Sequence, residues 1–135
     1  MNAIEHSIEY RHPENILVLA KSSGKTIGSL EIIDESHIYD EDGEDICFDI
    51  VSAEVDESQR RKGIYLGMIR YFLDENRYGV TSLRSQKWPD FDEGHSRSED
   101  ADLFWESLYA RQKQLGLNIE REGDDEYGWD YTIHK

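Results

Sequence analysis

The sequence predicts an α/β (α+β) fold in which a mixed, mostly antiparallel sheet of about seven strands carries two main helices. Two observations predict it. Short apolar runs bounded by turn residues recur along the chain, and the apolar spacing changes twice to the helical period. The expected order is β-β-β-β-α-β-α-β-β. Because the 135 residues contain no repeat and no linker, we interpret residues 1–135 as a single domain.

Four strands are expected in the first part of the chain. Residues 4–10 alternate between apolar and polar side chains, as an edge strand does. The apolar runs Ile16–Ala20 and Thr26–Ile33 flank the turn Ser22–Lys25, which predicts a hairpin. Ile46–Val55 is the fourth expected strand.

The two helices alternate with the remaining strands. Apolar residues fall at helical spacing between Ile64 and Glu75. A second helix is expected over Glu99–Leu115, where Ser98 is a good N-cap and Gly116 a good terminator. The other expected strands are short and cover residues 79–84, 118–121 and 129–133.

The charge of the chain restricts its partners. Thirty acidic residues against fifteen basic ones give a formal net charge of −15, and residues 34–45 contain seven acids with no Lys or Arg. Such a surface repels phosphate backbones and anionic lipids, so we expect no direct nucleic-acid or membrane binding. It attracts cationic amines, either on basic proteins or on small molecules such as polyamines.

Cysteine and histidine usage bound the chemistry further. Cys47 is the only cysteine, which excludes an internal disulfide and fits a reducing compartment. The five histidines are scattered, so no metal site is predicted. No apolar run reaches the length of a membrane span, and the first residues contain no signal-peptide core. We therefore expect a cytoplasmic protein that acts as a monomer or homodimer.

The most informative segment joins the fourth strand to the first helix. It contains three consecutive cations, Arg60, Arg61 and Lys62, followed by Gly63. A helix amino terminus exposes unpaired N–H groups and a positive dipole end, and glycine lets a ligand approach the backbone. This turn therefore predicts a site for an anion, most simply a pyrophosphate; a solvated basic turn is the alternative.

Val55, Arg60, Gly63 and Tyr65 resemble the acetyl-CoA-binding motif V-x-x-x-x-Q/R-x-x-G-x-G/A of the GNAT N-acetyltransferase superfamily, with Tyr65 where Gly or Ala is usual. The turn Gly24–Gly28 resembles a second motif of that family, a Gly-bounded hairpin. The segment Ser98–Trp105 resembles a third, the N-x-x-A-x-x-x-Y helix, with Ser98 for the Asn and Trp105 for the Tyr. The family's first two helices have little room in this chain.

The resemblance implies acetyl-CoA as cosubstrate and an acetyl group transferred to an amine. It implies that backbone N–H groups near Ala53 to Val55 face the thioester carbonyl. It implies further that the turn and the second helix hold the coenzyme through Arg60, Arg61, Lys62, Gly63, Ile64, Tyr65, Ser98 and Trp105.

The proton-transfer groups are chosen among acids and tyrosines near these positions. Asp49 lies six residues before Val55, where lysine-acetylating members of the family carry a base glutamate, and strand alternation predicts that it shares a face with Ala53. Glu54 is the second candidate base; it should point to the other face unless a bulge turns it. Tyr109, one helical turn after Trp105, is the candidate acid.

Two functions from different classes remain open. The first is an N-acetyltransferase acting on a primary amine of a cationic acceptor, with Trp88, Pro89 and Phe91 in a position to line the acceptor pocket. The second is a non-catalytic acidic interaction protein, or an inhibitor that mimics DNA, on the same fold. The basic turn favours the first, since a DNA mimic has no use for it.

Overall fold

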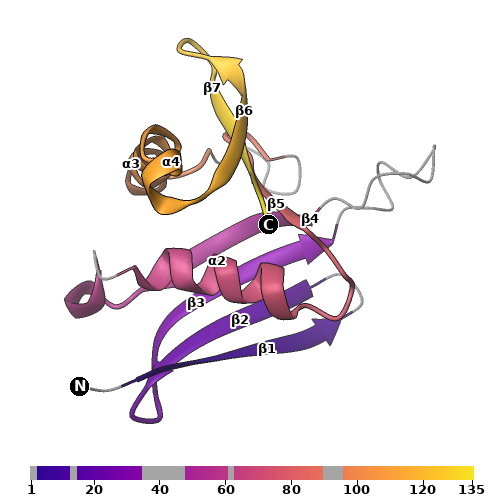
Figure 1. Ribbon diagram of the computed structural model, residues 1–135, viewed down its shortest axis with the longest axis vertical. Helices are drawn as coiled ribbons and strands as arrows, with labels where there is room; N and C mark the ends of the chain where they lie inside the picture. Colours follow the sequence, from indigo (N-terminus) through magenta and orange to yellow (C-terminus); the bar gives the residue numbers. More distant parts are fainter. Residues whose placement is uncertain (1–2, 13–14, 35–47, 61–62, 90–95) are drawn as a thin grey trace.

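The strands form one seven-stranded sheet in the order β1-β2-β3-β4-β5-β7-β6 (Figure 1). The computed structural model describes residues 3–12, 15–34, 48–60, 63–89 and 96–135. Neighbouring strands are antiparallel except β4 and β5, which are parallel. The strands are β1 (Ile4–His12), β2 (Asn15–Ser22), β3 (Lys25–Asp34), β4 (Phe48–Val55), β5 (Ser82–Ser85), β6 (Asn118–Asp124) and β7 (Gly128–His134).

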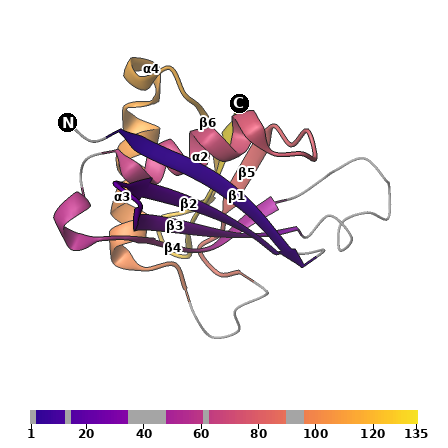
Figure 2. The ribbon, with the colours of Figure 1, turned by 90° about the horizontal axis from the view of Figure 1, so that it is seen from below.

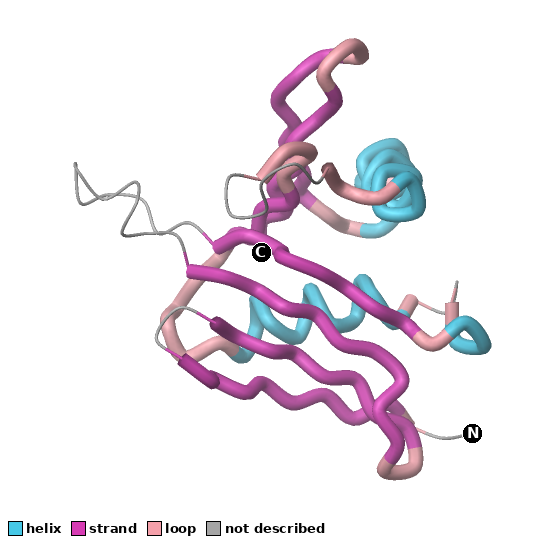
Figure 3. Tube along the Cα trace, turned by 180° about the vertical axis from the view of Figure 1, so that it is seen from behind, coloured by secondary structure: helices cyan, strands magenta, loops and turns pink. Residues whose placement is uncertain are grey.

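The helical elements lie on the two sides of the β4–β5 junction. They are η1 (Glu57–Gln59), α2 (Ile64–Glu75), α3 (Glu99–Ala110) and α4 (Gln112–Leu115). Seen from behind, strands β1 to β4 lie in front of α2 (Figure 3), so α2 covers one face of these four strands. Helices α3 and α4 form a column that runs across the strand direction (Figure 2). None of the helices in the described ranges is long and apolar enough to cross a bilayer.

The core lies between α2 and the covered face of the sheet. The apolar side of α2 contributes Ile64, Met68, Ile69, Phe72 and Leu73. The strands contribute alternate residues, which is the pattern of a sheet with one covered face. Their fully or almost fully buried members include Ile16, Val18, Leu30, Ile32, Phe48 and Leu83.

Gly28 of β3 sets how closely α2 approaches the sheet. A Cβ at this position would lie 3.0 Å from Ile64 Cγ2 and 3.2 Å from Met68 Cε. A larger residue would therefore force these two side chains to shift by a few tenths of an ångström. The second glycine of the hairpin motif therefore brings the first turn of α2 against β3.

A β-bulge at Val51 changes which face of the sheet each residue of β4 occupies. Glu31 pairs with Ser52 and the next residue, Ile32, pairs with Ile50, so Val51 is the extra residue. Ser29, Glu31 and Ile33 of β3 pair with Glu54, Ser52 and Asp49. Paired residues share a face, so all of these lie on the face away from α2.

The bulge corrects one prediction. Strand alternation predicted that Asp49 shares a face with Ala53; this is wrong, because Ala53 pairs with the buried Leu30 on the face that α2 covers. The same bulge places Glu54 on the face of Asp49.

The predicted fold class and element order are confirmed. The expected helix Glu99–Leu115 divides at Arg111 into α3 and α4, and the expected strand 79–84 is observed at Ser82–Ser85. β1 and β2 are separated by two residues, which is too few for a helix. The acidic stretch from residue 35 onward, Cys47, Arg61, Lys62 and Phe91 lie outside the described residues.

Candidate functional site

Strands β4 and β5 meet at one residue pair and then separate. Asp49 of β4 pairs with Arg84 of β5, and this is the single pair in their register within the described residues. From Ile50 to Val55, β4 pairs with β3 on its other side. Backbone N–H and C=O groups of a strand point alternately to its two sides, so this stretch presents polar groups toward the gap beyond the Asp49–Arg84 pair. Ala53 and Val55, the predicted carbonyl-binding residues, lie in this stretch.

The amino end of α2 has the features of an anion site. Its N-cap, Gly63, has φ +78°, a left-handed conformation that favours glycine. The N-cap glycine offers no capping side chain, and among the described residues no acid lies in the first turn of α2. The helical ladder begins with the Gly67 N–H bond to the Gly63 carbonyl (2.9 Å), so the N–H groups of Ile64 and Tyr65 precede it. These N–H groups and the helix dipole attract a negative group.

Arg60 lies in the turn before α2 and is the described residue that brings a positive charge to this end of the helix. Its side chain is exposed, and its Nε donates to the Val55 carbonyl at 3.3 Å. This bond joins the turn to the last residue of β4. The predicted coenzyme contact at Arg60 thus lies between the end of β4 and the start of α2.

Tyr65 packs between α2 and α3. Its ring stacks on Phe104 with centroids 4.1 Å apart. Burial raises the pKa of Tyr65 to about 12, against smaller opposing effects of the Trp105 side chain and the Arg97 charge. A thiol has a pKa of about 8.5, so this phenol is the weaker acid and is poorly suited to protonate a leaving thiolate.

Trp105 stands where the N-x-x-A-x-x-x-Y motif has its tyrosine, and it was predicted to contact the coenzyme. Its side chain is fully buried and stacks on Tyr131, with centroids 5.7 Å apart. Its Nε1 makes no hydrogen bond of ordinary geometry with the described residues, but its interaction with the Tyr65 side chain slightly opposes the rise that burial causes in the pKa of that phenol. The indole thus packs in the core next to Tyr65.

The other predicted residues on α3 have structural partners. Ser98 Oγ accepts from the Ala101 N–H at 3.2 Å, so Ser98 is the N-cap of α3. Tyr109 meets Tyr131 edge to face, and the Arg121 guanidinium lies 4.3 Å from its ring centroid. These contacts place the Tyr109 ring toward β6 and β7, and the acid role of Tyr109 stays a prediction.

The two predicted bases differ in environment. Asp49 is fully buried, and Arg84 donates to both of its oxygens, from Nε to Oδ1 at 2.5 Å and from Nη2 to Oδ2 at 2.9 Å. Gln86 Nε2 donates to Oδ1 at 3.1 Å. Glu54 is exposed on the same sheet face, next to the last residue of β4. Three donors occupy the buried carboxylate of Asp49, whereas that of Glu54 is open to an acceptor, so the geometry favours Glu54 as the base.

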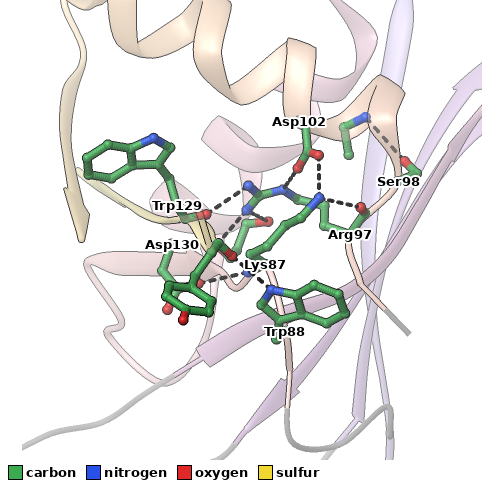
Figure 4. A network of polar contacts seen from close by, with 10 residues as sticks. Lys87, Trp88, Arg97, Ser98, Asp102, Trp129 and Asp130 are labelled. Carbon is green, nitrogen blue, oxygen red and sulfur yellow. Dashed lines mark hydrogen bonds and ion pairs between the residues drawn. The ribbon is translucent and has the colours of Figure 1, made fainter. Parts of the chain in front are cut away.

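A polar network that sequence reasoning missed lies beyond β5 (Figure 4). Arg97 donates from Nε to Asp102 Oδ1 (2.7 Å), from Nη1 to the Ser85 carbonyl (3.0 Å) and from Nη2 to the Trp129 carbonyl (2.8 Å). Lys87 Nζ reaches the second oxygen of Asp102 at 2.5 Å. The network joins β5, α3 and β7, and no local sequence signal marks it because its members come from separate segments.

Comparisons with known proteins place this arrangement among acetyltransferase structures. No protein-family model and no curated protein sequence matches the chain. An acetyltransferase from Thermus thermophilus superposes with a TM-score of 0.52 at 13% identity, over 91% of this chain and 64% of that one. The chain thus spans less than two thirds of the Thermus protein.

Two further solved structures are similar. An aminoglycoside 6'-N-acetyltransferase complexed with coenzyme A gives a TM-score of 0.50 at 18% identity, over 92% of this chain and 73% of that one. The aminoglycoside 6'-N-acetyltransferase from Enterococcus faecium gives 0.50 at 17% identity, with the same coverage. At these identities the likeness concerns the fold. The chain has a GNAT-like fold, as the sequence motifs predicted.

Proposed function

We propose that this GNAT-like domain is an acyl-CoA-dependent N-acyltransferase, with acetyl-CoA as donor, that acts on a primary amine of a cationic acceptor. One observation carries the proposal. The N-cap of α2 is a glycine without a capping side chain, no acid lies in the described first turn, and Arg60 lies in the turn that precedes the helix. In a chain of net charge −15, this is a rare place where an anionic pyrophosphate is favoured.

The residues present fit such a donor. A Cβ built on Gly63 meets no atom within 4 Å, so the space above this turn is open. The N–H groups of Gly63, Ile64 and Tyr65 would hold the pyrophosphate, with Arg60 as counter-charge. Backbone N–H groups of β4 near Ala53 and Val55, on the side that does not face β3, would orient and polarise the thioester carbonyl.

The reaction then needs little from the protein. The deprotonated amine attacks the carbonyl carbon, a C–N bond forms and the C–S bond breaks. The amine proton passes to Glu54, directly or through water, and the sulfur leaves as a thiolate that water protonates. Asp49 acts here as a positioning residue, since its ion pair with Arg84 joins β4 to β5 at the base of the gap.

The acceptor class follows from charge. With thirty acidic and fifteen basic residues, the protein raises the local concentration of cations around it. This supports an amine on a basic protein or a small polyamine and disfavours a substrate attached to nucleic acid.

Calorimetric titration with acetyl-CoA, with desulfo-CoA as a comparison, tests the donor site. We expect micromolar binding that Arg60→Glu weakens at least tenfold. Arg11→Glu is the matched control: Arg11 follows Tyr10, which lies in register with Ile16, Ile32 and Ile50, toward the far end of β4 from Val55. Release of free thiol in the presence of a lysine peptide then reports transfer. Absence of binding at millimolar acetyl-CoA would contradict the proposal and favour the acidic interaction protein.

A further inference from the structure

A pocket of about 350 Å³ opens between α3, the segment after β5 and the β6–β7 hairpin. It is separate from the amino end of α2. Its lining residues come from three segments: Lys87, Trp88 and Arg97; Asp102 and Glu106; and Arg121, Asp125, Glu126, Tyr127, Gly128, Trp129 and Tyr131. The polar network of Figure 4 forms part of its wall.

The inner wall of the pocket is held by partly buried ionic contacts. Arg97 has a side chain that is 7% exposed, and it is bonded to β5, α3 and β7. Lys87 shares Asp102 with it, and the Lys87 backbone N–H donates to Asp130 Oδ1 at 2.8 Å. These contacts set the positions of the side chains that form the inner wall, as the supporting contacts of a preorganised site do.

The rim carries aromatic rings that are held in place but open to solvent. Trp88 is 59% exposed, yet its Nε1 donates to the Tyr127 carbonyl at 2.8 Å. Tyr127 is itself 68% exposed. Trp129 Nε1 donates to Asp125 Oδ1 at 3.2 Å. Fixed, exposed aromatic faces are poorly explained by folding, because they bury little surface; they attract cations through the ring quadrupole.

The charges in the pocket also favour a cation. Lys87 and Arg97 are both paired with Asp102, and the Arg121 guanidinium lies 4.1 Å from the Trp129 ring centroid and 4.3 Å from that of Tyr109. Three lining carboxylates, Glu106, Asp125 and Glu126, form no ion pair with the residues that the structure describes. Asp102 thus engages Lys87 and Arg97, and two aromatic rings engage Arg121. Asp125 accepts a bond from Trp129, which leaves the carboxylates of Glu106 and Glu126 available to a ligand.

The pocket is connected to the amino end of α2 by aromatic packing. Tyr131 of the pocket wall stacks on Trp105, and Trp105 meets Phe104 edge to face at 5.7 Å. Phe104 in turn stacks on Tyr65, the second residue of α2. A ligand that orders the pocket thus packs against the same run of rings that supports the donor site.

We propose that this pocket binds an alkylammonium group of the acceptor, with the cation over the Trp88 ring and between the carboxylates of Glu106 and Glu126. Its role as an acceptor site rests on the proposed transferase function; the binding itself does not. Two sources share this chemistry, a free alkyldiamine and a lysine side chain in a peptide.

Binding is measured by calorimetry without any acyl-CoA, so that it is independent of the donor site. The probes are 1,5-diaminopentane and an end-capped Gly-Lys-Gly peptide. Their matched neutral controls are 1,5-pentanediol and the peptide with norleucine in place of lysine. We expect the charged probe of at least one pair to bind at least tenfold more tightly than its neutral control, and the pair that does so identifies the source.

Variants locate the binding. Two variants should each raise the Kd for the amine at least fivefold: the single variant Trp88→Ala and the double variant Glu106→Gln/Glu126→Gln. Trp88→Phe keeps an aromatic face, so its Kd should stay within threefold of the parent value. Glu75→Gln, an exposed carboxylate of α2, is the charge-matched control and should change nothing.

Equal binding of the neutral and charged probes, or unchanged binding in Trp88→Ala, would overturn the proposal, as would no binding of either amine at millimolar concentration. Amine binding in a protein that does not bind acetyl-CoA would support this pocket and contradict the transferase function. Acetyl-CoA binding in a protein that binds neither amine would support the transferase function and contradict this pocket.

Discussion

Asp49 and Arg84 lie opposite each other at the one position where β4 and β5 pair within the described residues, and their side chains form a two-point ion pair at that position. The backbone pairing and the ion pair therefore hold β4 and β5 together at the same position. This position is the base of the gap between the two strands, and polar backbone groups of β4 face that gap.

Removing the Asp49 carboxylate should destabilise the fold strongly. Asp49→Ala removes the fully buried carboxylate from its ion pair with Arg84, and breaking a buried pair costs about 3 kcal/mol. Urea unfolding of the parent and the variant measures the change. Ser52→Ala is the control on the same sheet face, because it removes only the 3.3 Å bond to Glu31 and should cost less than about 0.5 kcal/mol. If both variants lost a similarly small amount of stability, the ion pair between Asp49 and Arg84 would not be what holds β4 to β5.

Two glycines should respond in opposite directions to alanine. Gly28→Ala brings a Cβ to 3.0 Å from Ile64 Cγ2 and should cost about 1–3 kcal/mol through overpacking. Gly67→Ala lies within α2, where the nearest atom to its Cβ is His6 Nε2 at 3.5 Å, and should stabilise by about 0.5–1 kcal/mol through helix propensity. Thermal unfolding of both variants checks the prediction, which fails if their melting temperatures shift in the same direction.

Arg97 should not be replaceable by lysine. Arg97→Lys keeps the charge but cannot donate together to Asp102 and to the Ser85 and Trp129 carbonyls. We expect a loss of about 2–3 kcal/mol and faster amide exchange in β7 than in β2. Arg111→Lys, at an exposed position, is the matched control. Unchanged exchange in β7 would show that the network does not hold the hairpin.

Tyr65 should make stability depend on alkaline pH. Its pKa is raised to about 12 in the folded protein, whereas the unfolded chain has the ordinary value of about 10. Above pH 10 the phenol ionises in the unfolded chain before it ionises in the folded protein, so the free energy of unfolding falls between pH 10 and 12. Below pH 10 the phenol is protonated in both states, and its ionisation does not change the stability.

Tyr65→Phe isolates this contribution. Relative to the parent, the variant should gain stability as the pH rises above 10, with a constant difference at pH 7 to 9. Urea midpoints measured across pH 8 to 11.5 provide the comparison. A constant difference over the whole range would mean that the phenol is not shielded by Phe104 and its neighbours.

Local signals in the sequence were enough for most of the fold. The apolar spacing of α2 and the hairpin around Gly24 depend on residues close in sequence, and both were predicted correctly. The turn at Arg60 and Gly63 was also recognisable, because a glycine before an amphipathic helix is a local feature.

What the sequence did not reveal depends on contacts between distant segments. The Asp49–Arg84 pair joins residues 35 positions apart, and Arg97 reaches the Trp129 carbonyl 32 positions away. The bulge at Val51 depends on how β4 aligns with β3, which no property of β4 alone determines. The predicted face of Asp49 was wrong for this reason.

The extra residue at Val51 also decides which side chains of β4 meet water. If β4 kept Val51 but alternated without a bulge, Ser52 and Glu54 would enter the layer against α2, and Ala53 and Val55 would leave it. Deleting Val51 would instead remove the bulge and keep every later residue on its present face, because Ser52 would then follow Ile50 in simple alternation. A single inserted residue thus keeps the carboxylate of Glu54 exposed, and β4 should tolerate loss of Val51 better than loss of a residue that pairs with β3.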